Sequence, residues 1–193
     1  LSIRRQRQMC IRDSSYTMQQ AEIQNYFGEL RTDIEAVSYG FYFLEFAEYV
    51  TRENNDETEI LKLLYQTMRI VVKRSISLSL IRCIFELKMI CLEGEAPQVF
   101  SCVGCGKQGE PYWFSAAKGG LLCRDCVSKA SDARRVGQST VYALAFIVAT
   151  PVEKLYTFTV TEKVLEELKQ SAKRCVDVYI GHTFRSLEML EFL

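Results

Sequence analysis

Two C-x-x-C pairs are the residues of this chain whose types and spacing could bind a metal ion. Cys102 and Cys105 form the first pair, Cys123 and Cys126 form the second, and seventeen residues separate the two pairs. Each pair places two thiolates on one tight turn, and two such turns supply the four sulfur ligands of a tetrahedral structural zinc site. A catalytic zinc ion keeps one position open for water, and four cysteines leave none. The spacing therefore predicts a Zn²⁺ ion that supports structure and performs no chemistry.

The residues between the two pairs fit a hairpin that would carry them. Tyr112–Ser115 has the composition of a strand, residues 116–120 that of a turn, and Leu121–Leu122 that of the returning strand. Gly104 and Gly106 give the first turn the freedom to curl its backbone around a sulfur atom. We therefore predict a zinc-ribbon-like hairpin over residues 100–128, inserted into a larger domain.

Three other uses of four cysteines compete with zinc. Thioredoxin-type redox chemistry needs one C-x-x-C at the end of a strand in a βαβ unit, which this sequence does not show. Two disulfides would suit a secreted protein, but no signal peptide is visible. An iron–sulfur cluster could use four thiolates, although pairs this far apart on a hairpin suit zinc better.

The composition limits the classes of protein to which the chain can belong. Of its 193 residues, 48% are hydrophobic, which is enough for one ordinary domain with a sizeable core. Its 24 Lys and Arg residues balance its 24 Asp and Glu residues, so any contact with nucleic acid has to come from local patches. The longest apolar run, Val141–Ala149, is too short to span a membrane.

The remaining cysteines indicate the redox compartment. Cys83, Cys91 and Cys175 lie in apolar helical stretches, and Cys10 lies near the start of the chain. Buried free thiols are typical of a reducing environment, so we expect a cytoplasmic protein.

The first residues do not look like the start of a domain. Leu1–Ser14 begins without Met, lacks an apolar period and is biased towards basic residues. A basic arm for nucleic acid is one interpretation. We favour a non-native or disordered leader over residues 1–17, with the domain covering residues 18–193.

The first predicted helix starts at about Met18. Its apolar residues recur at alternating steps of three and four, which places them on one helix face. Residues 41–43 are all aromatic and broaden that face, so we expect burial on more than one side. The six residues of the face are Phe27, Leu30, Ile34, Val37, Phe41 and Leu44.

Four further helices follow from the apolar pattern. Asp56 marks the start of the second helix, residues 75–77 separate it from the third, and Pro97 lies just beyond the end of the third. After the hairpin, Val141–Ile147 reads as a short buried helix, and Thr161 begins the last long one. The sequence thus predicts a mainly α fold, a helical bundle with an inserted four-cysteine zinc hairpin.

No motif predicts catalysis. His182 is the single histidine and has no nucleophile or carboxylate pattern around it, so a structural or solvated role is expected. The sequence contains no phosphate-binding glycine loop, no H-E-x-x-H and no G-x-S-x-G. We therefore predict that the protein is not an enzyme.

Two sets of residues are candidates for binding. Arg82 and Lys88 beside Phe85 could grip an acidic peptide with an apolar tip, although a solvated helix face is the simpler interpretation. Basic residues in and just after the hairpin could contact nucleic-acid phosphates. The basic residues are Lys107, Lys118, Arg124, Arg134 and Arg135.

The order of several segments along the chain is characteristic of one known family. The helical segment Ile81–Ile90 runs through residues 93–97 into the first C-x-x-C-G, and the rest of the hairpin follows. Residues 27–42 lie upstream and residues 179–187 downstream. Together they resemble the RecO family of bacterial DNA-repair proteins over about residues 18–193. The Phe-Glu-Leu helix that leads into C-x-x-C-G is the most specific part.

The resemblance implies a function without covalent chemistry. Proteins of this family pair an N-terminal OB-fold with a helical domain that carries the zinc hairpin, and we expect the OB-fold to be missing from this chain. The family binds single-stranded DNA, anneals complementary strands, joins RecR, and helps to exchange the single-strand-binding protein SSB for RecA. It also places a contact with the SSB C-terminal tail on the helical domain, which favours Arg82 and Lys88. Some members have lost the cysteines, so zinc would be a support, and the location would be cytoplasmic and nucleoid-associated.

One alternative of a different class stays open at this point. A helical protein–protein adaptor with a structural zinc, unrelated to repair, would show the same cysteines and the same helices.

Overall fold

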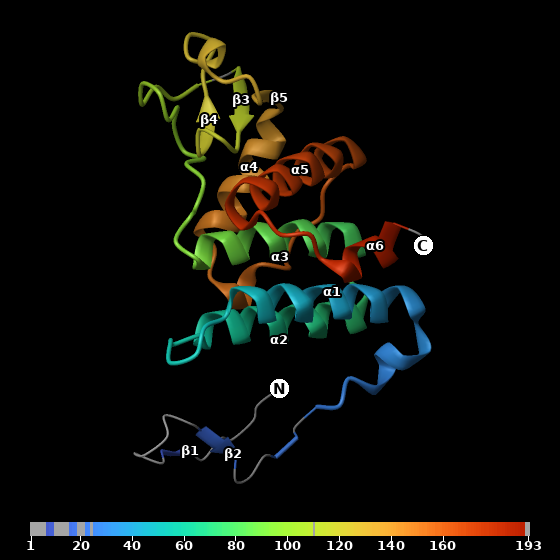
Figure 1. The fold of residues 1–193 in the computed structure, drawn as a ribbon. Coiled ribbons are helices and arrows are strands. Elements are labelled where there is room, and N and C mark those ends of the chain that lie inside the picture. The colour runs from blue at the N-terminus through green and yellow to red at the C-terminus, as the bar shows by residue number, and fades with distance from the viewer. Residues whose placement is uncertain (1–6, 10–15, 19–21, 24, 110, 192–193) are drawn as a thin grey trace.

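The structure, a computed structural model, describes residues 7–9, 16–18, 22–23, 25–109 and 111–191. Its body is a bundle of α-helices: α1 (Ile34–Val50), α2 (Thr58–Lys73), α3 (Leu78–Leu92), α4 (Gln138–Ala149), α5 (Glu162–Cys175) and the short α6 (Arg185–Glu191). Figure 1 shows α1 and α2 below α3, α4 and α5 above it, and a small sheet at the far end of the molecule. The predicted fold class, mainly α with an inserted hairpin, is confirmed.

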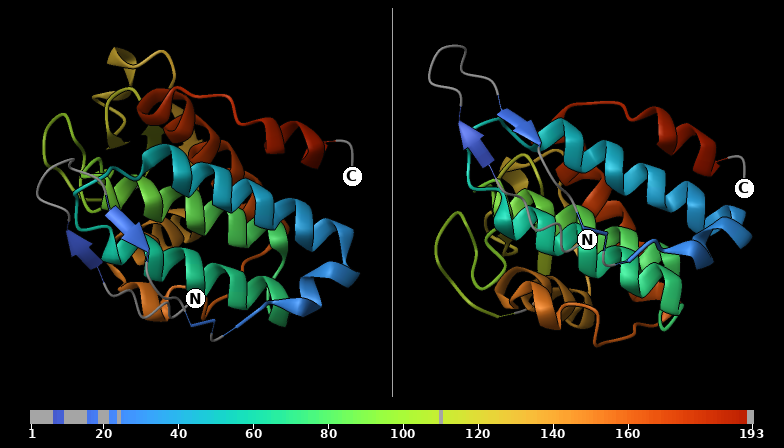
Figure 2. Two further views of the ribbon diagram at one scale, coloured as in Figure 1. Left: turned by 60° about the horizontal axis from the view of Figure 1, so that its bottom comes forward. Right: turned by 90° about the horizontal axis from the view of Figure 1, so that it is seen from below.

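Helix α3 lies at the centre of the bundle. Eleven of its fifteen residues are buried, and it contacts α1, α2, α4 and α5. It begins where predicted, because Arg74 ends α2 in the left-handed conformation and the Ser77 hydroxyl accepts a hydrogen bond from the Leu80 N–H at 3.3 Å. A helix that is apolar on nearly every side needs neighbours on every side. The bundle is therefore arranged around α3 (Figure 2).

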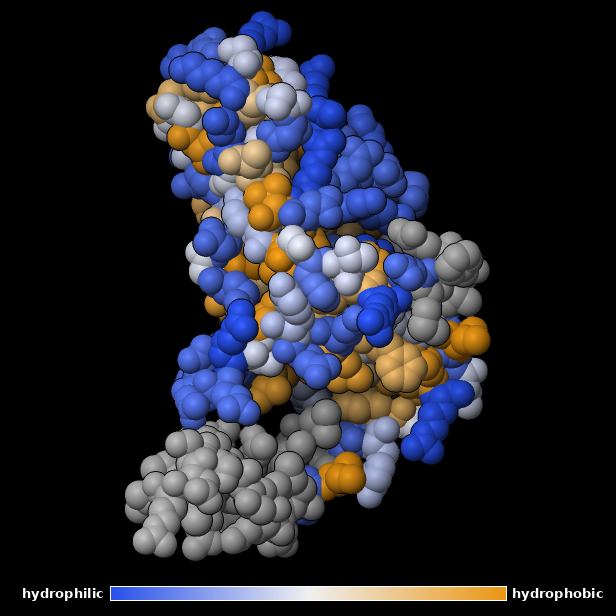
Figure 3. Space-filling view, in the orientation of Figure 1, coloured by the Kyte–Doolittle hydropathy of each residue, from blue (hydrophilic) through white to orange (hydrophobic). Residues whose placement is uncertain are grey.

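The face predicted for the first helix is only partly right. Leu30 is buried and Phe27 and Val37 pack against the core, whereas the other half of the face is exposed. α1 starts at Ile34, where Asp33 accepts a hydrogen bond from the Ala36 N–H, and a 3-10 helix, η1 (Gly28–Thr32), precedes it. Ile34 and Phe41, two residues of the predicted face, are 74% and 57% exposed. Figure 3 shows apolar residues gathered on the lower part of the body, where Figure 1 places α1.

The opposite side of α1 is buried for a steric reason. Tyr42, Phe43 and Phe46 are fully buried there. A Cβ atom at Gly40 would lie 3.3 Å from the Met68 Cε atom, so the glycine lets α2 come close. Because α1 is apolar on both sides, the sequence period alone could not select between them. The side of α1 that carries Gly40 and the buried aromatic rings packs against the bundle, and the side that carries Ile34 and Phe41 faces solvent.

The second half of the chain matches the predicted helices. α4 ends at Ala149, two residues before Pro151, and a 3-10 turn, η3 (Val152–Lys154), follows. α5 continues into a π-helix, η4 (Val176–Ile180), which ends at Gly181 with a φ of 61°. Among the described residues, no helix combines the length and the apolar character that crossing a bilayer requires.

The inserted hairpin is part of a three-stranded antiparallel sheet. β3 (Tyr112–Ser115) pairs with β4 (Gly120–Leu122), as predicted, and also with β5 (Arg134–Val136), which lies beyond the predicted hairpin. A short 3-10 turn, η2 (Val127–Lys129), lies between β4 and β5. We call residues 98–136 the zinc lobe. Phe114 and Leu121 belong to the main core, whereas Trp113 packs with the cysteines, so the sheet joins the lobe to the bundle.

The predicted leader, residues 1–17, falls largely outside the described residues. Within the described part, β1 (Arg7–Met9) pairs antiparallel with β2 (Tyr16–Met18). The division of the chain at residue 17 stays a prediction.

Two residues assigned to a partner-binding surface lie in the core instead. Phe85 is fully buried, and its ring centroid lies 4.7 Å from that of Phe43. Lys88 is 7% exposed, and its ammonium group donates to the carbonyl oxygens of Thr150 at 2.8 Å and Val148 at 3.1 Å. These carbonyls end helix α4, where a cation satisfies unpaired acceptors and the helix dipole. Lys88 therefore joins α3 to α4, and neither residue can grip a peptide at the surface.

Replacing Lys88 by Met should destabilise the fold by about 1–3 kcal/mol, because the α4 carbonyls lose a charged donor inside the protein. Urea unfolding of Lys88→Met measures the change. Lys73→Met removes an exposed ammonium from the end of α2 and should stay within about 0.5 kcal/mol of the parent. Equal effects of the two substitutions would show that the contact with α4 does not stabilise the bundle.

Candidate metal centre and candidate binding pocket

The fold brings the two C-x-x-C pairs together. The sulfur atoms of Cys102, Cys105, Cys123 and Cys126 all lie within 4.8 Å of one another, and the Cys105 and Cys123 sulfurs are 3.6 Å apart. Zn–S bonds of about 2.3 Å in a tetrahedron would separate the sulfurs by about 3.8 Å. The four-cysteine cluster therefore has the donor set and the spacing to bind a metal ion.

Two glycines make close approaches within the zinc lobe possible. A Cβ atom at Gly104 would lie 2.9 Å from the Cys126 sulfur, closer than real Cβ contacts, so the first turn can pack on the second only with glycine there. At Gly120, a Cβ atom would lie 2.1 Å from the Gln98 carbonyl oxygen, and Gln98 pairs with the hairpin at this point. The backbone that leads from α3 into the lobe is thereby held against β4.

The electrostatics of the cluster favour binding a cation. Burial raises the pKa of Cys102, but backbone N–H groups, chiefly those of Cys123 and Gly104, outweigh it and lower that pKa to about 6. The hydrogen bond to Cys105 and burial raise the pKa of Cys126 to about 12. Four thiolates this close repel one another, and a dication would allow all four to ionise.

The structure does not gather the five predicted nucleic-acid contacts into one surface. All five side chains are exposed. Lys107 pairs with Asp125 at 3.0 Å beside the cysteines, whereas Lys118 lies in the β3–β4 turn at the other end of the hairpin. Arg134 and Arg135 are adjacent on β5, so their side chains leave opposite faces of the sheet. Arg124 lies in the second C-x-x-C turn, close in sequence to Asp125.

Of the predicted partner site, Arg82 lines a pocket. Its Nε donates to a Glu86 carboxylate oxygen at 2.7 Å, and the Tyr42 hydroxyl donates to the same oxygen at 2.5 Å. Burial and the charge of Glu86 raise the pKa of Tyr42. Burial opposes the charge on Arg82, but Glu86 still raises the pKa of Arg82. Glu86 is 2% exposed, so this pairing keeps a buried carboxylate satisfied and fixes the guanidinium.

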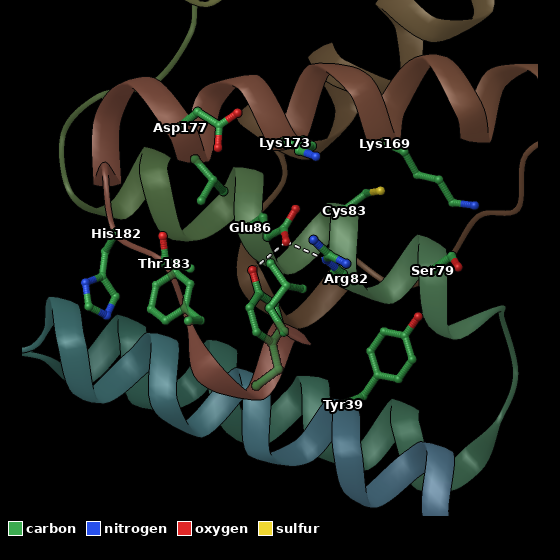
Figure 4. A pocket seen from close by; sticks show the side chains of 14 residues that line it. Tyr39, Ser79, Arg82, Cys83, Glu86, Lys169, Lys173, Asp177, His182 and Thr183 are labelled. Carbon is green, nitrogen blue, oxygen red and sulfur yellow. Dashed lines mark hydrogen bonds and ion pairs between the residues drawn. The ribbon is translucent and has the colours of Figure 1, made fainter. Parts of the chain in front are cut away.

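The pocket around Arg82 has a volume of about 360 Å³ and lies between α1, α3, α5 and the segment that leads into α6 (Figure 4). Two lysines of α5, Lys169 and Lys173, extend along it from the side opposite α1. They are four residues apart and share a helix face. The sequence places both lysines on the solvent side of their helix, but it contains no signal that they meet Arg82, more than eighty residues earlier.

The C-terminal segment forms the apolar wall of this pocket. Phe184 is fully buried and Leu187 is half-buried, and both line it. Glu45 of α1 holds the segment in place by accepting hydrogen bonds from the Arg185 N–H at 3.1 Å and the Ser186 N–H at 2.9 Å. His182 is exposed and stacks on Tyr49, with ring centroids 4.1 Å apart, in agreement with a structural role.

Comparisons with known proteins agree in one family. Residues 31–188 match the family model described as "Recombination protein O C terminal". The chain is 33% identical over 178 residues to the DNA repair protein RecO of Alkaliphilus metalliredigens, covering 91% of this chain and 72% of that protein. It is 27% identical over 179 residues to the RecO protein of Acetivibrio thermocellus, with 92% and 71% covered. For the RecO protein of Desulforudis audaxviator the identity is 31% over 174 residues, with 90% and 69% covered.

Proposed function

Because the chain belongs to the RecO family of DNA repair and recombination proteins, we propose that it mediates recombination by binding SSB, RecR and single-stranded DNA. In this role it promotes strand annealing and the loading of RecA, as part of the RecFOR pathway. The family consists of recombination mediators that generally lack catalytic activity. An adaptor unrelated to repair does not fit this membership. The observation that carries the proposal on this chain is the cationic, partly apolar pocket around Arg82.

The four-cysteine cluster holds a structural Zn²⁺ ion in this proposal. Zinc accepts four thiolates in a tetrahedron and leaves no position for a substrate. The small cluster of buried residues around the cysteines, Leu122, Ala130 and the partly buried Trp113, is too limited to hold the outer end of the lobe by apolar burial alone. A metal ion supplies the missing stability, on the order of 10 kcal/mol in sites of this kind.

Removing a ligand by Cys102→Ser or Cys123→Ser should abolish the binding of about one zinc equivalent per chain and unfold the outer end of the lobe. Metal analysis measures the first effect. Trp113 is the only tryptophan and packs against the cluster, so a red shift of its emission measures the second. Cys91→Ser changes a cysteine outside the cluster and should alter neither. A metal-free protein with unchanged Trp113 emission would refute a structural zinc.

The pocket suits the SSB C-terminal tail, an acidic peptide with an apolar tip. The Nε atom of Arg82 makes the ion pair with Glu86. The two terminal nitrogens of the guanidinium are therefore the atoms that could bind a ligand carboxylate. Lys169 and Lys173 add two cations, and together with Arg82 they outnumber the two carboxylates of the pocket, Glu86 and Asp177. Leu187, which is half-buried, provides an apolar surface for the tip, and the fully buried Phe184 lies behind it.

The double variant Lys169→Ala/Lys173→Ala should weaken binding of a fluorescent SSB-tail peptide about tenfold, measured by anisotropy at low salt. Lys163→Ala removes an exposed cation from the same helix outside this pocket and is the matched control. Arg82→Lys keeps a positive charge beside Glu86 but loses the planar guanidinium group, so it should also weaken binding of the peptide. Binding that is insensitive to the double variant, or equally sensitive to Lys163→Ala, would exclude this pocket as the tail site.

We propose that Lys107, Lys118, Arg124, Arg134 and Arg135 contact nucleic-acid phosphates as separate positions along the lobe. Arg134→Ala/Arg135→Ala should reduce the affinity for a single-stranded oligonucleotide and lower the slope of log affinity against log salt by about 1–2. Lys73→Ala, at the end of α2, should leave the slope unchanged. An unchanged slope in the β5 variant would show that this part of the lobe does not contact phosphates.

A further inference from the structure

One short segment contacts both the zinc lobe and the pocket. It is the π-helix η4, which continues α5. Val176 and Asp177, at its start, line the pocket. Tyr179, two residues later, donates from its hydroxyl to the Ala116 carbonyl oxygen at 3.0 Å, in the β3–β4 turn. π-helices are rare and are frequently found at functional sites.

A second contact links α5 to the same turn. The Arg174 guanidinium donates to the Asp132 carbonyl oxygen at 2.6 Å. The Asp132 carboxylate in turn accepts from the Ser115 hydroxyl at 2.6 Å and the Ala117 N–H at 3.1 Å. Asp132 therefore connects the end of α5 to Ser115 and Ala117, where β3 enters the hairpin turn.

A third contact lies about two turns nearer the start of α5. The Glu167 carboxylate accepts hydrogen bonds from the Gly137 N–H at 2.8 Å and from the Thr140 hydroxyl, directly after β5. In the continuous helix formed by α5 and η4, residues 167, 174 and 179 contact the lobe and the residues that follow it. Residues 169, 173, 176 and 177 of the same helix line the pocket. Figure 4 shows Lys169, Lys173 and Asp177 extending from this rod along the pocket.

The hairpin connects the cysteines to the turn that Tyr179 contacts. Cys123 directly follows β4, and the Val103 N–H in the first cysteine turn donates to the Leu121 carbonyl oxygen at 2.8 Å. β4 is three residues long, so its two ends lie beside the cysteine cluster and beside the turn. A disturbance of the cysteine turns therefore reaches the turn through one short strand.

We propose that the metal state of the four-cysteine cluster controls the pocket, because the lobe positions the wall formed by α5 and η4. Tyr179 and Arg174 are the positioning residues. The end of the lobe that carries the cysteines is folded with metal and unfolded without it. The position of α5 and η4 changes between these two states. The ligand in this inference is the SSB-tail peptide, so the predicted change in peptide affinity rests on the proposed function. The predicted effect on the structural order of α5 and η4 does not.

The coupling predicts two linked changes. Metal-free protein should bind the tail peptide about five- to twentyfold more weakly than zinc-loaded protein. Because coupling between two binding sites is reciprocal, saturating peptide should raise the affinity for zinc by the same factor, measured by competition with a chelator.

Hydrogen exchange tests the wall without any peptide. Removal of zinc should increase amide exchange over residues 174–184, which include η4, and not only in the lobe. Tyr179→Phe removes the hydroxyl and keeps the ring. It should raise amide exchange in the same residues and lower the affinity for the tail peptide severalfold, while the protein still binds one zinc equivalent. Tyr142→Phe, at a position that is 78% exposed, is the matched control and should change neither.

The outcomes separate this inference from the proposed function. Unchanged exchange over 174–184 on zinc removal, or a Tyr179→Phe protein identical to Tyr142→Phe, would overturn the coupling. Increased exchange together with no tail binding by zinc-loaded parent protein would support the coupling and overturn the tail as the ligand of the pocket.

Discussion

Burial of charged groups on α3 is the constraint on which the rest of the structure depends. Glu86 and Lys88 lie on a helix that is almost entirely inside the bundle, and a buried charge without partners would cost several kcal/mol. Glu86 is satisfied by Arg82 and Tyr42, which ties α3 to α1. Lys88 is satisfied by the carbonyls at the end of α4. These contacts attach α1 and α4 to α3, and the ion pair with Glu86 holds Arg82 where it lines the pocket.

The same rod of helix serves two parts of the protein. One set of α5 and η4 residues holds the zinc lobe, and another lines the pocket, because side chains of a helix leave it in all directions. Phe114 and Leu121 extend the main core into the lobe, so the lobe is continuous with the bundle although its cysteines lie at the far end. The four-cysteine cluster therefore belongs to a lobe that is held by the same helix that lines the pocket.

Much of the fold could be predicted from local signals. The start of α3 follows from Ser77, whose hydroxyl caps the helix, and the end of α4 from Pro151, which cannot continue one. The cysteine spacing identifies the hairpin. The errors share a cause. α1 carries apolar residues on both sides, and the choice between the Phe41 side and the Tyr42 side depends on which neighbours can approach. β5 was not predicted because its pairing partner lies some twenty residues away.

By itself, the sequence determined the four-cysteine cluster, the mainly helical class and the resemblance to one family, because spacing within a turn and the period of a helix are local properties. Only the tertiary structure decided that Phe85 and Lys88 are core residues and that Arg82 is joined by Lys169 and Lys173. Burial and the meeting of side chains distant in sequence depend on how helices pack against one another, and packing selects among faces that look equivalent in one dimension.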